Sequence, residues 1–330
     1  MKRPSRKSKS NRRSQPLTWP AALERFQDHM LARNLRPLTV SGYAIVLARF
    51  RAQLAQPGPL PLSGEVTLDL LRAYQVGLFT GATSASGRPL GADTVATATT
   101  VLRTFFRFLA AEELIARDPT LRLDQPQAPP RPPGSVLTVK EVQKLLAAAD
   151  TSTHLGLRDR AALEVLYATG LRRAELLGLD LGDVDHAERE VVVREGKGGK
   201  GRVVPVTRSA WLALQDYLER GRAAFLRPGH TARAGTLVFL VRSGQPMGPK
   251  AVEKMLRRLG ALAGIKKRIT AHTMRRSFAT HLLKAGASLR HIQVLLGHAS
   301  LETTAAYLCL NRQELRREVV LKHPRERIEV

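Results

Sequence analysis

Six side chains in the C-terminal half of the chain are of types that can cleave phosphodiester bonds. One is a tyrosine, and a phenol with a pKa of about 10 is a poor nucleophile unless a general base and nearby positive charge activate it. Phosphoryl transfer also needs cations that hold the extra negative charge of the transition state. Two arginines, a lysine and two histidines could supply both kinds of help. In chain order, the six are Arg172, Lys197, His272, Arg275, His298 and Tyr307.

Each of these residues alone has a plain structural interpretation. His272 and Arg275 are three positions apart at an expected helix start, so they share one helix face, where a hydrogen-bonded pair is the more common role. Tyr307 alone would be a packing residue on an amphipathic helix. Lys197 alone would be a solvated lysine in a glycine-rich turn, although glycines also let a backbone approach phosphate. The order and spacing of all six together favour the catalytic interpretation.

Four motifs in a fixed order carry a resemblance to a known family. The chain contains A-T-G-L-R-R-A-E-L-L-G-L, then G-K-G-G-K-G-R-V-V-P-V, then H-T-M-R-R-S-F-A-T-H-L-L, and finally L-L-G-H-A-S-L-E-T-T-A-A-Y. Together they resemble the tyrosine recombinase (phage integrase) family, and most closely its Xer-like members, over residues 20–325. The sequence departs from the Xer-like pattern at Arg276, where histidine is usual, and at Met274, where leucine is common. Neither departure removes a member of the catalytic set.

The resemblance implies an enzyme, a site-specific recombinase that cuts and rejoins double-stranded DNA. Tyr307 would attack the scissile phosphate, giving a 3′-phosphotyrosyl DNA and a free 5′-hydroxyl. Arg172 and Arg275 would clamp the non-bridging oxygens of that phosphate. Strand exchange between two duplexes would then pass through a Holliday junction.

The resemblance assigns the other three side chains to proton transfer and hydrogen bonding. His272 would relay the phenolic proton, Lys197 would protonate the departing 5′ oxygen, and His298 would donate a hydrogen bond to the phosphate. Because side chains neutralise the charge, we expect no divalent metal in the chemistry. Because the phosphotyrosine keeps the bond energy, we expect neither ATP nor another cofactor.

The charge of the chain independently favours a polyanionic partner. Its 330 residues include 53 Lys and Arg against 28 Asp and Glu, a net charge of +25 with a pI near 11.2. The first sixteen residues hold seven Lys and Arg and no acid, so +18 remains on the rest. Much of the excess is arginine, the better phosphate binder, and such a surface favours nucleic acid through counterion release.

Cysteine content and hydropathy indicate the cellular compartment in which the protein is expected. Cys309 is the single cysteine, so neither an intrachain disulfide nor a cysteine zinc site is expected. The basic N-terminus has no apolar stretch after it, unlike a secretory signal, and no run of eighteen apolar residues occurs. We therefore expect a cytoplasmic protein without a membrane segment.

Composition divides the chain into four parts. Residues 1–16 are expected to form a basic disordered arm, and residues 125–134, with five prolines, a semi-rigid linker. Residues 17–124 are predicted to be a helical DNA-binding bundle, because apolar residues recur at spacings of three and four. Thr100, Arg103 and Arg107 could form a phosphate-contacting face, and an ordinary solvated face is the alternative. Residues 135–330 are predicted to be the catalytic domain. The recurring apolar positions are Val40, Tyr43, Leu47, Phe50, Leu54, Val95, Ala98, Leu102, Phe105 and Leu109.

The second domain is predicted to be mainly α with one small antiparallel sheet. Thr138 and Glu141 form a capping-box pattern, and a helix over about 157–169 would end at Gly170. Residues 190–194 and 202–206 are rich in β-formers and read as a hairpin, with 237–241 as a third strand. Gly297 would end a further helix just before His298.

Two questions stay open from the sequence. Within recombination, Xer-like chromosome dimer resolution competes with phage or mobile-element integration; a type IB topoisomerase and a silent DNA-binding regulator are the alternatives. The resemblance also implies a homo- or hetero-tetramer on two DNA sites, with the C-terminal tail docked on a neighbouring subunit. Folding of the tail back onto its own domain is the alternative. The apolar strip of that tail comprises Leu310, Leu315, Val319 and Val320.

Overall fold

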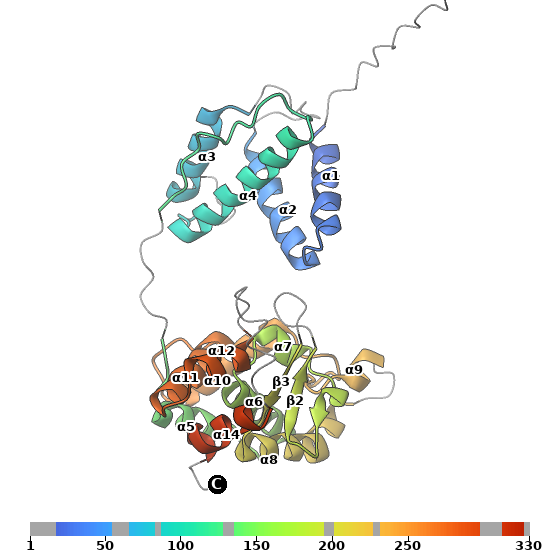
Figure 1. Cartoon of the computed structure of the whole chain (residues 1–330), viewed down its shortest axis with the longest axis vertical. Helices are drawn as coiled ribbons and strands as arrows, with labels where there is room; N and C mark the ends of the chain where they lie inside the picture. Colours follow the sequence, from blue (N-terminus) through green and yellow to red (C-terminus); the bar gives the residue numbers. More distant parts are fainter. Residues whose placement is uncertain are drawn as a thin grey trace, which may run out of the picture. The chain divides into compact units, whose positions relative to one another are not determined.

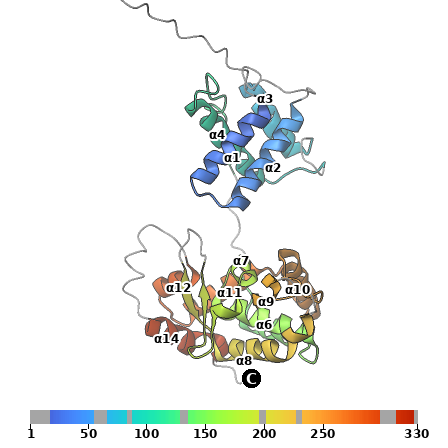
Figure 2. The same ribbon diagram turned by 90° about the vertical axis from the view of Figure 1, so that its right-hand side faces the viewer.

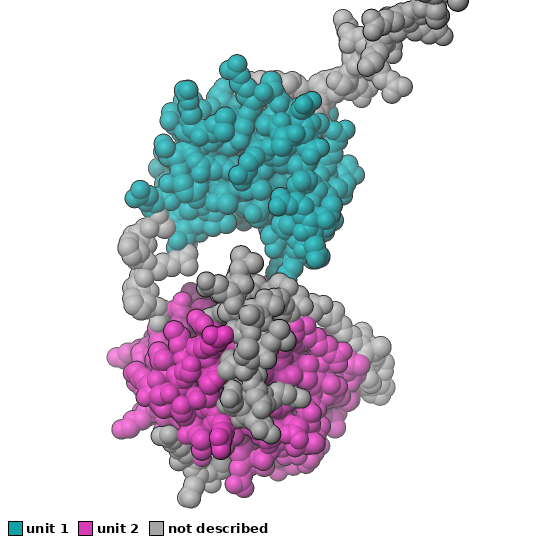
Figure 3. All heavy atoms as spheres, viewed as in Figure 1, with its two compact units in different colours: residues 1–132 teal, residues 133–330 magenta. Residues whose placement is uncertain are grey.

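Two compact units make up the chain, residues 1–132 and 133–330 (Figure 3). Each unit has its own buried core. The structure, a computed structural model, describes residues 18–54, 66–82, 87–127, 135–194, 201–226, 232–297 and 312–326. The predicted arm and residues 128–134 of the predicted linker lie outside the described residues. The four-part division of the chain therefore stays a prediction.

Unit 1 is a helical bundle around an aromatic core. Trp19 packs on Phe105 with ring centroids 5.3 Å apart, and Phe26 meets the same ring edge-on at 5.2 Å. Aromatic pairs in this geometry add stability beyond the area they bury. The helices are α1 (Trp19–Ala32), α2 (Pro37–Gln53), α3 (Leu68–Thr80) and α4 (Ala92–Ala111) (Figure 1).

The longest helix of this unit, α4, follows the predicted apolar period. Val95, Leu102 and Leu109 are fully buried on its core side. On its polar face, Arg107 is exposed, whereas Arg103 is half-buried and donates a hydrogen bond to the Leu123 carbonyl. The Arg103 guanidinium therefore makes a hydrogen bond within unit 1, whereas Arg107 is exposed to solvent.

Unit 2 is mostly helical with a small sheet at one side (Figures 1 and 2). Its helices before the sheet are α5 (Val139–Ala147), α6 (His154–Thr169), α7 (Arg173–Leu177) and the 3₁₀ turn η1 (Leu181–Asp183). The strands are β1 (Val184–Asp185), β2 (Glu190–Val193) and β3 (Arg202–Pro205). The elements after the sheet are α8 (Arg208–Asp216), η2 (Tyr217–Gly221), η3 (Arg222–Phe225), α9 (Ala232–Thr236), α10 (Pro249–Leu262), α11 (Ala271–Lys284), α12 (Leu289–Leu296), α14 (Arg312–Lys322) and η4 (Pro324–Glu326).

The sheet is antiparallel with strand order β1-β2-β3. Val191 at its centre lies opposite Val184 on one side and Val204 on the other. The hairpin of β2 and β3 was predicted from the sequence and is present.

The predicted third strand over residues 237–241 is wrong, because β1 takes that place. Leu237 and Leu240 make only isolated bridges, to Asp180 and to Pro246. Residues 237–240 are all buried in the core of unit 2. A short apolar run that is buried on all sides has the same pattern whether or not it joins a ladder, so periodicity could not decide this point.

Helix α6 is the centre of unit 2, and α8 and α11 pack against it (Figures 1 and 2). It ends at Gly170, which has a φ of +62°. A Cβ at this position would lie 2.6 Å from the Phe278 ring and 2.8 Å from Leu296. Both the left-handed conformation and the close packing require glycine, and the turn places Arg172 two residues later.

The C-terminal segment packs on its own unit. Val319 of α14 is fully buried, while Val320 is 43% exposed. Beyond α14, His323 is fully buried and its Nε2 lies 3.1 Å from the Tyr167 carbonyl oxygen, and the buried Arg325 pairs with Glu164. This arrangement agrees with the fold-back alternative for the tail, whereas docking on a neighbour stays a prediction.

Candidate active site

Arg172 is the N-cap residue of α7 and is held by three hydrogen bonds. Its backbone N–H donates to Glu175 Oε2 and its Nη1 donates to Glu175 Oε1, both at 2.7 Å. Its Nη2 donates to the Gly297 carbonyl at 2.9 Å. The side chain remains 30% exposed, so a fixed guanidinium still faces solvent.

Arg275 reaches the same place from the first turns of α11. Its Nη1 donates to the Gly170 carbonyl at 2.8 Å and its Nη2 to the Leu296 carbonyl at 2.6 Å. Burial, with the nearby charge of Arg172, lowers the pKa of Arg275 to about 10. The guanidinium therefore stays charged at neutral pH.

His272 lies one turn before Arg275 and is more exposed. Partial loss of solvent lowers the pKa of His272, and the charges of Arg276, Arg275 and Arg172 lower it further. The imidazole is therefore neutral at pH 7, which is the form that accepts a proton. A neutral histidine beside two arginines is suited to general base catalysis at a phosphate.

Glu175 and Arg202 complete this cluster, and Arg202 was missed by the sequence prediction. Arg202 donates Nη1 to Glu175 Oε1 at 2.9 Å and Nη2 to Oε2 at 2.8 Å. Burial alone would raise the pKa of Glu175, but the hydrogen bonds from Arg202 and Arg172 and the charge of Arg202 bring it to about 2. Its carboxylate is therefore ionised at neutral pH. One feature of the sequence could have indicated Arg202: it is a basic residue at the start of a predicted strand, directly after a basic, glycine-rich turn.

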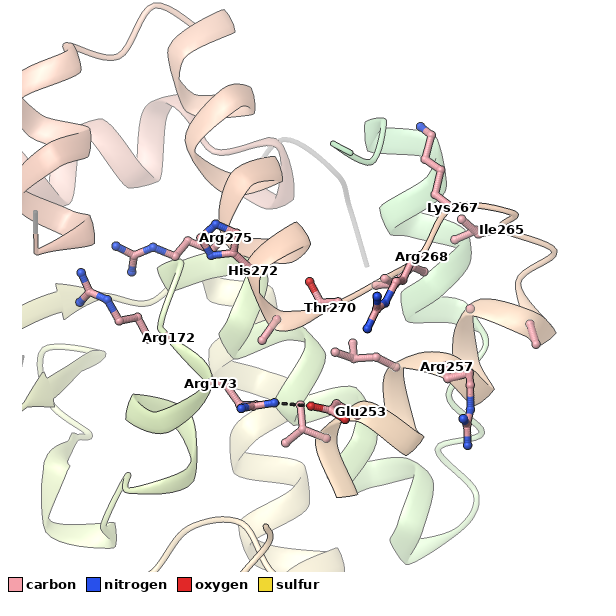
Figure 4. Close-up of a pocket in the computed structure, with 16 residues that line it drawn as sticks. Arg172, Arg173, Glu253, Arg257, Ile265, Lys267, Arg268, Thr270, His272 and Arg275 are labelled. Carbon is pink, nitrogen blue, oxygen red and sulfur yellow. Dashed lines mark hydrogen bonds and ion pairs between the residues drawn. The ribbon is translucent and has the colours of Figure 1, made fainter. Parts of the chain in front are cut away.

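A cavity of about 650 Å³ opens beside these residues (Figure 4). Figure 4 shows Arg172 and Arg275 turned toward the same side of the pocket, and Arg173 paired with Glu253. Glu253 is the one carboxylate among the described lining residues, so the wall is strongly cationic. Such a wall suits an anionic ligand. The other charged or polar side chains of the wall are Arg257, Lys267, Arg268, Thr270 and His272.

The structure brings together three of the six predicted site residues: Arg172, His272 and Arg275. Lys197, His298 and Tyr307 lie outside the described residues. The catalytic set of six therefore stays a prediction. Within the described ranges no group of three or more His, Cys, Asp or Glu is placed to hold a metal ion. No helix in these ranges is long and apolar enough to cross a membrane.

Comparison with known proteins gives the family. Residues 135–314 match the model described as "Phage integrase family". Tyrosine recombinase XerC 2 of Ralstonia nicotianae is 39% identical over 92% of this chain and 85% of its own length. Tyrosine recombinase XerD of Mycobacterium tuberculosis is 38% identical over 92% of this chain and 98% of its own length.

Solved structures share the fold. A lambda integrase (75–356) dimer bound to a COC′ core site has a TM-score of 0.64 at 20% identity, covering 86% of this chain and 96% of that one. The Tn1549 transposon integrase in complex with circular intermediate DNA has a TM-score of 0.62 at 20% identity, covering 90% and 98%. The predicted fold class, mainly α with a small antiparallel sheet, is confirmed.

The fold is that of the solved integrase structures, and the family model and the relatives give the class of protein. The chain belongs to the phage integrase family. It is a tyrosine recombinase, an enzyme of site-specific recombination, as the resemblance of its motifs predicted.

Proposed function

We propose that this recombinase cleaves and rejoins double-stranded DNA through a 3′-phosphotyrosyl intermediate formed by Tyr307. The observation that carries the proposal is the convergence of Arg172, Arg275 and His272 at one edge of a cationic cavity. Two fixed guanidinium groups match the two non-bridging oxygens of a phosphodiester, and they need no reorganisation when charge develops there.

The proposed bond changes are those that the family resemblance implies. The phenolic oxygen of Tyr307 bonds to phosphorus while the bond to the 5′ oxygen breaks. His272 accepts the phenolic proton, Lys197 donates a proton to the leaving oxygen, and His298 donates a hydrogen bond to the phosphate. In the reverse reaction a 5′-hydroxyl attacks the phosphotyrosine, so the energy of the original bond is conserved.

The proposed assembly is a tetramer of identical or paired subunits on two DNA sites. A lambda integrase tetramer bound to a Holliday junction has the fold of this chain, with a TM-score of 0.63 at 20% identity, covering 89% of this chain and 78% of that one. A net charge of +25 supports a DNA partner. Relatives named XerC and XerD support chromosome dimer resolution in the cytoplasm over integration of a mobile element.

A nicked suicide duplex tests the proposal. The target site is first selected from a randomised duplex library by binding of the full chain, and a nick next to the scissile phosphate then traps the covalent product. Wild type should form a denaturation-resistant DNA adduct, and Tyr307→Phe should lose the adduct but keep duplex binding. Tyr43→Phe, a half-buried tyrosine of unit 1, is the matched control. An adduct that survives Tyr307→Phe would refute the assignment, and relaxation without junction formation on paired sites would indicate a topoisomerase.

A further inference from the structure

Three arginines from three separate elements cap the end of one helix. Arg202 Nε donates to the Leu295 carbonyl at 2.8 Å, Arg275 Nη2 to Leu296 at 2.6 Å, and Arg172 Nη2 to Gly297 at 2.9 Å. Carbonyl groups in the last turn of a helix have no partner within the helix and carry its negative dipole end. The C-terminus of α12 therefore accepts hydrogen bonds from β3, from α11 and from the start of α7, and so connects the three elements.

Arg202 differs from the other two arginines because it is closed to solvent. Its side chain is 4% exposed, and each of its three nitrogens donates to a carboxylate or carbonyl oxygen. Gly297 packs directly against it: a Cβ there would lie 3.1 Å from Nη1 and 3.2 Å from Cδ of Arg202. Arg202 is thus not placed to touch a substrate, and any effect it has must pass through Glu175 and the end of α12.

We propose that Arg202 is a positioning residue of the cleavage reaction, which orients the phosphate-binding guanidinium of Arg172 and keeps its charge available. The inference rests on the proposed function, in which Arg172 and Arg275 hold the scissile phosphate. Its first part is geometric. The bidentate pair with Arg202 fixes the Glu175 carboxylate, and that carboxylate fixes both the backbone and the side chain of Arg172.

The second part is electrostatic. Glu175 is shared between two guanidinium groups, so it does not neutralise Arg172 alone. Arg172, Arg202 and Arg275 against this single carboxylate leave a cluster charge of +2. Without Arg202 the same cluster would carry +1, and Glu175 would pair with Arg172 only. The electrostatic stabilisation of a phosphorane-like transition state would fall accordingly.

Arg202 also joins the hairpin to this cluster. It is the first residue of β3, opposite Val193, and it directly follows the turn that contains Lys197 in the sequence. One side chain therefore ties the described end of the hairpin both to Glu175 and to the end of α12. Displacement of Arg202 would disturb the hairpin and the arginine clamp together.

Single-turnover cleavage of the suicide duplex at saturating protein measures this role. Arg202→Met should slow formation of the Tyr307 adduct by about 100-fold, the order expected when a charged group is lost or a clamp shifts by about 1 Å. Half-site affinity should change much less. Arg202→Lys keeps the charge but loses the bidentate fork, so its rate should be intermediate.

Arg222 supplies the matched control. It is also a buried arginine of unit 2, with hydrogen bonds to the carbonyl groups of Ala234, Gly235 and Leu237. Arg222→Met and Arg202→Met should both lower the melting temperature, but the folded fraction of Arg222→Met should cleave at nearly the wild-type rate. Equal rate losses in the two variants would mean that Arg202 has only a structural role.

Two further measurements separate positioning from stability. A methylphosphonate at the scissile position carries no negative charge, so the loss from Arg202→Met should shrink on it, as the loss from Arg172→Ala should. In a Glu175→Gln background, Arg202→Met should cost far less than it does alone, because both changes break the same link. A loss that is unchanged on methylphosphonate and additive with Glu175→Gln would overturn the inference. If wild type itself forms no Tyr307 adduct, the proposed function fails instead.

Discussion

Arg172 and Arg275 donate hydrogen bonds to two successive carbonyl groups, those of Gly297 and Leu296. Two cations are thereby held close together before any phosphate is present. Their mutual repulsion is part of the reason, after burial, that the pKa of Arg275 falls to about 10. An anion that binds between them relieves this repulsion. Folding therefore supplies the free energy that brings the two guanidinium groups together. Because they need not reorganise when the phosphate reacts, the barrier to cleavage is lower.

The pH dependence of cleavage should report His272. Because burial and three arginine charges lower its pKa, His272 remains neutral below its ordinary value of 6.5 and takes up a proton only at lower pH. Cleavage by wild type should therefore persist through pH 6.5 and decline below it. Arg276→Gln removes the largest of the charge effects and should move this acidic limb to higher pH. Single-turnover rates between pH 5 and 8 measure the shift.

Arg257→Gln is the control for this shift. Arg257 is an exposed arginine of the same cavity wall, and it is not among the charges that act on the pKa of His272. The acidic limb of the pH–rate profile of Arg257→Gln should coincide with that of wild type. Equal movement of the limb in both variants would point to a general charge effect on DNA binding.

Lys197 and Arg275 should differ in chemical rescue. If Lys197 protonates the leaving 5′ oxygen, Lys197→Ala should be slow on ordinary DNA and largely restored by a 5′-phosphorothiolate, whose sulfur leaves without a proton. Arg275→Ala removes charge stabilisation of the transition state and should not be restored. The measurement is the single-turnover rate on the two substrates, and equal rescue of both variants would contradict the assigned roles.

Cleavage should not require a divalent metal. The guanidinium groups of Arg172 and Arg275 are held where the proposed phosphate would bind, so side chains can carry the neutralisation. Adduct formation should proceed at an unchanged rate in excess EDTA. Loss of the adduct in EDTA, with recovery after Mg²⁺ is added, would require another mechanism.

Stability in acid should depend on His323. Its Nε2 donates to the Tyr167 carbonyl and its Nδ1 accepts from the backbone N–H of Arg325, so no site is left for a second proton. Burial lowers its pKa to about 3. The unfolded chain takes up this proton near pH 6.5 and the folded chain does not, so stability is full above pH 6.5 and falls as the pH drops toward 3.

His323→Gln should flatten this dependence. The wild-type free energy of unfolding should fall more steeply than that of the variant, by up to about 1.4 kcal/mol per pH unit. Urea unfolding at pH 7, 6 and 5, followed by Trp211 fluorescence in a Trp19→Phe background, measures the difference in slope. His154→Gln, a change at an exposed histidine, is the control. Parallel slopes for wild type and His323→Gln would disprove the role of His323.

The sequence predicted much of the fold because local signals agreed with the packing. The capping box of Thr138 and Glu141 and the left-handed Gly170 and Gly297 all occur where they were expected. Such signals depend on a few neighbouring residues. The pairing of residues 184–185 with β2 depends instead on contacts between segments, and a two-residue strand leaves no periodic pattern.

The candidate site was predictable as a set of residue types but not as a network. Arg172 and Arg275 stand out because their motifs resemble a family. Arg202 does not, because an arginine after a basic turn has the same appearance whether it is solvated or buried. Its role depends on Glu175 and on the end of α12, 27 and 93 positions away along the chain. Only the folded structure brings these groups together.

The docking of the C-terminal segment has a consequence for how often the nucleophile meets its site. Gly297 is bound to Arg172, and α14 with Arg325 is bound to the same unit, so the stretch that contains Tyr307 is attached at both ends. A chain of this length reaches only about 3.3–3.6 Å per residue. If Tyr307 acts as proposed and within its own subunit, we expect its effective concentration at the site not to change when the protein is diluted. Release of the Arg325–Glu164 pair would lower that concentration without touching the arginine clamp.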